Sequence, residues 1–233
     1  GFLPSVGLYF FWNDAGAPGH QFRMQASFGG VDRLHGTVRD RVLLDRHIEL
    51  STRIDAWRTP DRIYQGVGAL VLAANRARYR HNYVTGALDL TIAFWRRSTF
   101  ALGIGASWHD FSADGYDPGG VDPSLATALA EGSLDELPPG FDGYVAYRQH
   151  MALTLDSREE SPAPQHGVRL DLTAEHGIDL LHPVDRNWVR YGAALAGYVD
   201  VGAERVFSLH LQTAFVDPIG SSPVPFTELI QLG

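Results

Sequence analysis

The chain has 233 residues, of which 45% are hydrophobic and 20% are charged, and its formal net charge is −8. This length allows one large domain or two small ones, and the negative charge argues against a nucleic-acid partner. The sequence has no cysteine, which excludes disulfides and thiolate metal sites. It also has no apolar run of the roughly 18 residues that a membrane helix needs, and no signal-peptide pattern opens it.

Apolar and polar residues alternate with a two-residue period along most of the chain. Leu153 and Leu155 flank Thr154, and after a polar turn Leu170 and Leu172 flank Asp171. This period is typical of a β-strand with one apolar and one polar face. It predicts about eleven strands, most of them longer than the roughly 5 to 6 residues that are usual in soluble proteins. The predicted strands span residues 5–12, 21–29, 34–44, 47–57, 64–75, 78–95, 99–111, 143–156, 167–180, 188–200 and 204–216.

The connections between these strands differ greatly in length. Residues 96–98 and 201–204 form short turns, whereas residues 112–142 form a long loop. Within that loop, Asp122 is expected to cap a short helix, with Pro123 as its first residue and Gly132 as its end. Short turns at one end of a sheet and long loops at the other are typical of an outer-membrane β-barrel.

The tryptophans fit the same interpretation, because all of them fall at or near predicted strand ends. In a membrane barrel, large aromatic residues gather in belts at the two interfaces. The residues concerned are Trp12, Trp57, Trp95, Trp108 and Trp188.

The two faces of the strands are therefore expected to meet different surroundings, with the apolar face against lipid and the polar face lining a wide interior. The residues expected on the polar face are Arg23, Glu49, Arg53, Asp55, Asp89, Asp156, Arg169, Asp171, His210 and Gln212. A soluble lipocalin-like barrel or a large sandwich remains an alternative, because alternation alone does not distinguish inside from outside.

Three segments resemble motifs of one family of bacterial barrels. The first is the turn Asp156-Ser157-Arg158, followed by Pro164 and Gly167 at the start of a new strand. The second is the final segment, in which the matching residues are Pro225, Phe226, Ile230, Leu232 and Gly233. The third is the strand start with Tyr64, Gly66 and Gly68. With the motifs in their order along the chain, Tyr64 first and Gly233 last, and with this spacing, the chain resembles the bacterial surface antigen family, the BamA- and TamA-type barrels of outer-membrane protein assembly and two-partner secretion.

The resemblance implies an all-β, antiparallel transmembrane barrel that is incomplete in this chain. Residues 1–233 would be its N-terminal strands, about eleven of about sixteen, up to the start of the sixth outer loop. With eleven strands, the first and the last would both run outward from the periplasm. The implied location is the outer membrane of a Gram-negative bacterium. The implied partners are outer-membrane lipid, an unfolded or secreted polypeptide and the C-terminal strands of the same barrel.

No catalytic, cofactor-binding or metal-binding residue is predicted, and the chain is not expected to be an enzyme. The histidines lack metal-ligand spacing. Ser107 and His109 share a strand face with Asp110 beside them, but β-carbons about 7 Å apart are expected to be too far apart for a direct bond. Asp156 and Arg158 are interpreted as a structural pair at the barrel rim. Two other functions stay open: the barrel tail of a patatin-like phospholipase, and a passive porin or structural barrel.

Overall fold

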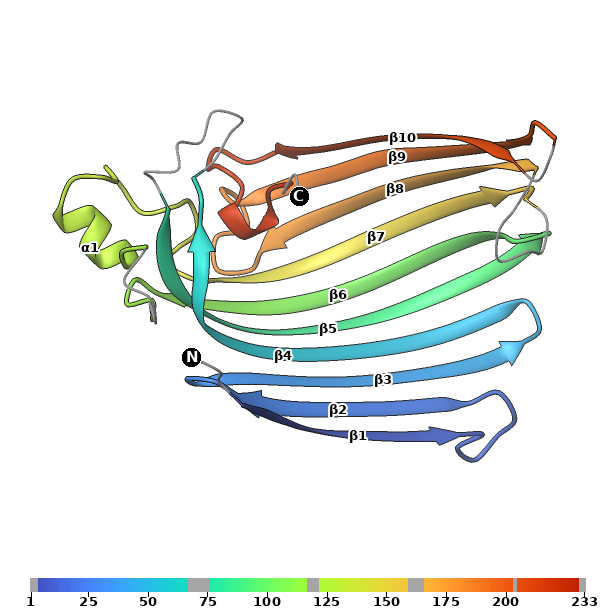
Figure 1. The fold of residues 1–233 in the computed structure, drawn as a ribbon, viewed down its shortest axis with the longest axis horizontal. Coiled ribbons are helices and arrows are strands. Elements are labelled where there is room, and N and C mark those ends of the chain that lie inside the picture. The colour runs from blue at the N-terminus through green and yellow to red at the C-terminus, as the bar shows by residue number, and fades with distance from the viewer. Residues whose placement is uncertain (1–3, 67–75, 117–121, 159–165, 203–204, 231–233) are drawn as a thin grey trace.

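The computed structural model describes residues 4–66, 76–116, 122–158, 166–202 and 205–230. Its ten strands form one antiparallel sheet in chain order, and each strand pairs with the next (Figure 1). The strands are between 9 and 19 residues long, and most exceed the roughly 5 to 6 residues usual in soluble proteins, as the alternation predicted. They are β1 (Ser5–Asn13), β2 (Gln21–Gly29), β3 (Arg33–Asp45), β4 (Ile48–Tyr64), β5 (Ala77–Trp95), β6 (Ser98–Ser112), β7 (Tyr144–Asp156), β8 (Gly167–Asp179), β9 (Asn187–Asp200) and β10 (Val206–Pro218).

The prediction of eleven strands is wrong for the described residues, which form ten. The strand predicted at 64–75 falls mostly on residues 67–75, outside the described ranges, and β4 pairs directly with β5. β4 also runs seven residues past its predicted end at Trp57, as far as Tyr64. The register shifts between Thr59 and Arg62, and this irregularity accommodates Pro60 inside the strand.

The two ends of the sheet differ in their connections. The turn rim carries the tight turns at residues 46–47 and 96–97, and the loop rim carries the 113–143 loop and the segment that follows β10. Figure 1 shows both described termini at the loop rim. With an even number of antiparallel strands, β1 and β10 run in opposite directions, so the expectation that both run the same way is wrong.

The strand register confirms the predicted separation into an apolar and a polar face, because residues directly opposite each other share a face. One apolar row crosses β4 to β10 through Leu50, Leu90, Leu102, Met151, Ala174, Tyr191 and Phe215. One polar row crosses β3 to β9 through Arg41, Ser51, Asp89, Gly103, His150, Glu175 and Arg190. All ten residues predicted for the polar face lie on it. The apolar face is exposed, as Leu8 at 77% and Phe207 at 62% illustrate.

The sheet does not close on itself. β1 pairs with β2 and β10 with β9, and within the described ranges neither has a partner on its other side. The strand count of ten is even, so an odd number of strands is not the reason for the open sheet. The open edges remain, and each presents backbone N–H and C=O groups without ladder partners.

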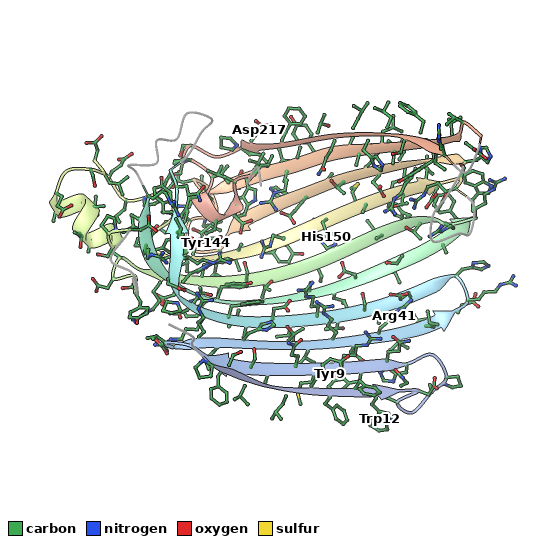
Figure 2. The ribbon with its side chains drawn as sticks, in the orientation of Figure 1. Tyr9, Trp12, Arg41, Tyr144, His150 and Asp217 are labelled. Atoms are coloured by element: carbon green, nitrogen blue, oxygen red, sulfur yellow. The ribbon has the colours of Figure 1, made fainter. Side chains whose placement is uncertain are left out.

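The predicted tryptophan belt is only partly correct. Trp12, Trp95 and Trp108 are 56%, 49% and 47% exposed, and Figure 2 shows Trp12 at the β1 edge. Trp57 instead lies in the middle of β4, where its ring stacks on His35 with centroids 3.7 Å apart. Trp188 is fully buried. Both residues point to the polar face: Trp57 is within the strand because β4 continues to Tyr64, and Trp188 packs in a buried cluster with Tyr144 and Val224.

The 113–143 loop contains the expected short helix, α1 (Leu125–Ala130). Its N-cap is Ser124, whose hydroxyl accepts from the Thr127 amide at 3.1 Å, so the prediction of Asp122 as cap is wrong. Asp122 pairs instead with Arg78 at 3.1 Å. Gly132 follows the helix with φ +72° and ends it as predicted. No helix of the described ranges is long and apolar enough to cross a membrane.

Candidate functional site

The chain after β10 folds back over the polar face at the loop rim. We call residues 219–230 the return segment; it contains the short 3₁₀ helix η2 (Phe226–Glu228). The Phe226 amide donates to the Pro139 carbonyl at 2.9 Å. The Phe226 ring packs against Tyr79 and Phe111, with centroids 5.5 and 5.2 Å apart. The segment is therefore held by the 113–143 loop and by the strands beneath it.

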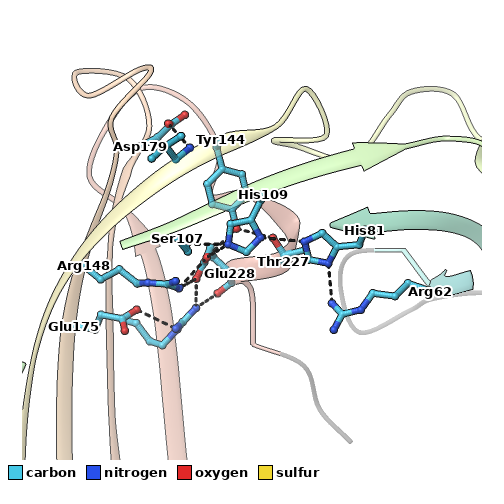
Figure 3. A network of polar contacts seen from close by, with 12 residues as sticks. Arg62, His81, Ser107, His109, Tyr144, Arg148, Glu175, Asp179, Thr227 and Glu228 are labelled. Carbon is cyan, nitrogen blue, oxygen red and sulfur yellow. Dashed lines mark hydrogen bonds and ion pairs between the residues drawn. The ribbon is translucent and has the colours of Figure 1, made fainter. Parts of the chain in front are cut away.

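A buried carboxylate fixes the return segment to the sheet (Figure 3). Glu228 is 3% exposed and accepts hydrogen bonds from Arg148 at 3.1 and 3.2 Å, from Arg190 at 3.1 Å and from the Tyr144 hydroxyl at 2.8 Å. Burial raises the pKa of Glu228, but the charge of Arg148, the hydrogen bond from Tyr144 and the charge of Arg190 outweigh burial, so the pKa lies below its ordinary value. Glu228 is thus a paired carboxylate. We call Glu228 and its three partners, Arg148, Arg190 and Tyr144, the Glu228 clamp.

Strand register brings the clamp residues together. Tyr144 and Arg148 lie four residues apart on β7 and therefore share its polar face. Arg190 of β9 lies directly opposite Glu175 of β8 and pairs with it at 3.0 Å. Glu175 thereby orients the guanidinium that reaches Glu228.

A glycine makes room for the aromatic support of the clamp. Trp188 lies opposite Gly177, and a β-carbon at Gly177 would overlap the indole ring. The indole also meets the Tyr144 ring edge-on, with centroids 6.5 Å apart. Gly177 therefore allows Trp188 to support the tyrosine that donates to Glu228.

A chain of side-chain hydrogen bonds leads from β4 toward the clamp. Arg62 Nη1 lies 3.1 Å from His81 Nδ1, and His81 Nε2 lies 3.0 Å from His109 Nδ1. His109 Nε2 lies 2.9 Å from the Ser107 hydroxyl and 3.9 Å from Glu228. The expectation that Ser107 and His109 are too far apart to bond is therefore wrong, since their side chains turn toward each other from the same face.

The direction of these hydrogen bonds decides what Ser107 can do. A guanidinium only donates, so His81 accepts at Nδ1 and a neutral His81 donates from Nε2 to His109. A neutral His109 then carries its proton on Nε2 and donates it toward Ser107 or Glu228. A serine nucleophile needs an imidazole lone pair at that position. Asp110 points to the other face, where it accepts from Asn82 at 3.0 Å.

The Asp156–Arg158 pair lies at the turn rim, at the opposite end of the sheet from the clamp. Arg158 Nε and Nη2 donate to the two Asp156 oxygens at 2.9 and 2.8 Å, and Asp156 is 2% exposed. The hydrogen bond to Asp156 raises the pKa of Arg158. The Asp156 amide also donates to Ser98 Oγ at 2.9 Å, which connects this turn to the β5–β6 turn. Asp156 therefore joins two neighbouring hairpins, through its side chain to Arg158 and through its amide to Ser98.

The motif residues from the sequence divide into two places. Pro225 and Phe226 lie beside the clamp, and Tyr64 meets Phe226 with ring centroids 5.8 Å apart. Gly167 starts β8 near Asp156 and Arg158, with φ +117°. Pro164, Gly68, Leu232 and Gly233 lie outside the described residues. Glu228 was not predicted; its only signal is a lone acid within the apolar stretch PFTELIQL. Within the described ranges, no three His, Cys, Asp or Glu side chains gather in a way that could hold a metal ion.

Comparison with known proteins supports the fold. No protein-family model matches the chain, and no curated protein sequence matches it. Among solved structures, BamA from Haemophilus ducreyi, crystallised without POTRA domains 1–3, matches with a TM-score of 0.64 and 12% sequence identity. The match covers 100% of this chain and 44% of that chain, so this chain spans less than half the length of its structural relative. The chain therefore has the fold of part of the BamA structure, an antiparallel sheet that forms part of a β-barrel wall.

Proposed function

We propose that this chain forms part of the wall of an outer-membrane barrel that inserts or translocates polypeptides. Its apolar face contacts lipid, and its polar face lines the interior through which a polypeptide chain is handled. The strands that complete the barrel lie elsewhere in the natural protein and pair with β1 and β10. The long strands, the exposed apolar face and the BamA-like fold support the barrel part of this proposal.

The polypeptide-handling part of the proposal rests on one observation: the Glu228 clamp holds the return segment against the polar face. This segment contains Pro225 and Phe226, two of the residues on which the resemblance to assembly and secretion barrels rests. An ordered segment on the inner wall would give a passing polypeptide a fixed surface to contact. The proton on His109 Nε2 leaves Ser107 without a base, so this pair itself does not support hydrolysis.

The test uses the natural protein in its own bacterium. Depletion should lower the amounts of other outer-membrane proteins or of secreted polypeptides, measured by quantitative mass spectrometry of membrane and culture fractions. Wild-type complementation should restore them, and Glu228→Ala should not. Glu131→Ala is the matched control, because Glu131 follows α1 and has no part in the clamp. Unchanged protein levels together with lost uptake of small solutes would refute the proposal in favour of a passive porin.

A further inference from the structure

Three arginines stand directly opposite one another on adjacent strands. Arg23 of β2 faces Arg39 of β3, and Arg39 faces Arg53 of β4. All three lie on the polar face, and we call them the arginine row. Neighbouring strands are about 4.8 Å apart, so the row spans about 10 Å. Like charges directly opposite each other destabilise a sheet, and this row occurs in a chain whose net charge is −8.

The nearby carboxylates leave part of this charge unbalanced. Arg53 pairs with Asp55, whereas the Asp89 carboxylate, which also borders the groove, contacts the His150 imidazole at 2.7 Å and no arginine of the row. Arg23 donates to the neutral amide of Gln21 at 3.5 Å. Within the described ranges, Arg39 has neither an ion pair nor a side-chain hydrogen bond. The centre and one end of the row therefore carry positive charge without a carboxylate partner.

The row borders a groove of about 320 Å³ on the turn-rim side of the sheet. Arg41, labelled in Figure 2, lines the same groove and pairs with Glu49. Asp40 is also at its border, but that carboxylate pairs with His20 at 2.6 Å. A volume of about 300 Å³ is at the small end of the range for small-molecule sites. The groove therefore suits a compact ligand rather than a macromolecule.

We propose that the arginine row binds a small anion with two or more negatively charged groups, phosphate or carboxylate. Guanidinium forks bind both groups in bidentate fashion. Charged groups about 5 Å apart in the ligand match the strand spacing, so one molecule can engage neighbouring arginines. Binding offsets the repulsion along the row, with Arg39 at its centre. This site lies at the other end of the sheet from the Glu228 clamp and does not depend on how the barrel handles polypeptides.

Calorimetric titration of the full natural chain in detergent, at low ionic strength, tests this site. Tripolyphosphate and tricarballylate serve as probes, and comparison of the two shows whether phosphate or carboxylate is preferred. The wild-type protein should bind at least one probe saturably. Arg39→Gln should weaken that binding about tenfold or more, and Arg39→Lys, which keeps the charge but loses the fork, should weaken it less.

Arg205→Gln is the matched control, since it removes one positive charge from the β9–β10 turn at the same rim but away from the row. It should change the dissociation constant by less than about twofold, because exposed, distant charges are screened. The proposal is overturned if the wild type binds neither probe, if Arg39→Gln binds as the wild type does, or if Arg205→Gln weakens binding as much as Arg39→Gln. Loss of heat-modifiable gel mobility would show that Arg39→Gln fails to fold. In that case Arg23→Gln and Arg39→Lys take its place in the binding test and are judged by the same criteria.

Discussion

The Asp89 carboxylate and the His150 imidazole are in contact across a strand that lies between them. Asp89 is on β5, His150 is on β7, and Gly103 of β6 is directly opposite both. The carboxylate Oδ1 lies 2.7 Å from the imidazole Nε2. The pair forms because Gly103 has no side chain, and a β-carbon there would overlap both partners.

Gly103→Ala should therefore destabilise the sheet by about 1–3 kcal/mol, the range for overpacking. Gly86→Ala is the control, because a β-carbon at Gly86 meets nothing within 4 Å. Urea unfolding of the full natural chain in detergent, followed by gel mobility, measures both effects. If Gly103→Ala costs less in a His150→Ala background, part of the lost stability comes from the Asp89–His150 contact. Equal effects of the two glycine substitutions would contradict the explanation.

The assignment of the faces predicts unequal effects for neighbouring residues of β10. Leu211 is on the apolar face and 56% exposed, and Gln212 is on the polar face. If the apolar face contacts lipid, Leu211→Arg should cost about 2–4 kcal/mol near the bilayer midplane, and Gln212→Arg much less. Folding titrations in lipid vesicles measure the difference. Equal costs would mean that lipid does not cover the apolar face.

The Glu228 clamp should depend on pH. Because the pKa of Glu228 is lowered on folding, its contribution to stability is complete above the unfolded value of about 4.3 and is lost as the pH falls through the lower folded value. Glu228→Gln should remove this dependence. At neutral pH it should cost about 1–3 kcal/mol, less than a fully buried pair, because Arg148 and Arg190 are 19% and 33% exposed. Urea unfolding of the wild type and of Glu228→Gln between pH 3 and 7 provides the measurement. If the free energies of unfolding of the two proteins change with pH in parallel, Glu228 is not a paired carboxylate.

The loop between β6 and β7 should face the cell surface if the loop rim points outward. A protease site inserted at Gly132, just after α1, should then be cut in intact cells. An identical insertion at Gly202, in the β9–β10 turn of the opposite rim, should be cut only after the outer membrane is permeabilised. The reverse pattern would invert the proposed orientation.

Residues 1–233 alone should not form a stable membrane barrel. β1 and β10 each have an open edge, and about half of the backbone groups on an edge strand point away from the sheet. Each unpaired group in hydrocarbon costs several kcal/mol, so two edges outweigh a typical stability of about 5–15 kcal/mol. In detergent or lipid, the isolated segment should therefore show no heat-modifiable gel mobility. A compact, protease-resistant monomer would mean that the sheet closes.

The sequence by itself determined the all-β class, the placement of ten of the eleven predicted strands and the division into two faces. These follow from a local rule, the two-residue period, which Leu102 and Gly103 obey on β6 as Leu211 and Gln212 do on β10. The same rule could not locate the end of β4, because a bulge carries the strand past Pro60 through pairing with β5.

Contacts between distant residues were decided only by the tertiary structure. Glu228 reaches Tyr144, 84 positions away in the chain, and Trp57 stacks on His35 from a neighbouring strand. Whether a residue on the polar face is exposed or buried depends on what folds over that face, and nothing in local alternation encodes this. Trp188 and Glu228 are buried because the return segment covers the loop-rim end of the polar face. Arg39 is exposed because no described segment covers the turn-rim end of that face.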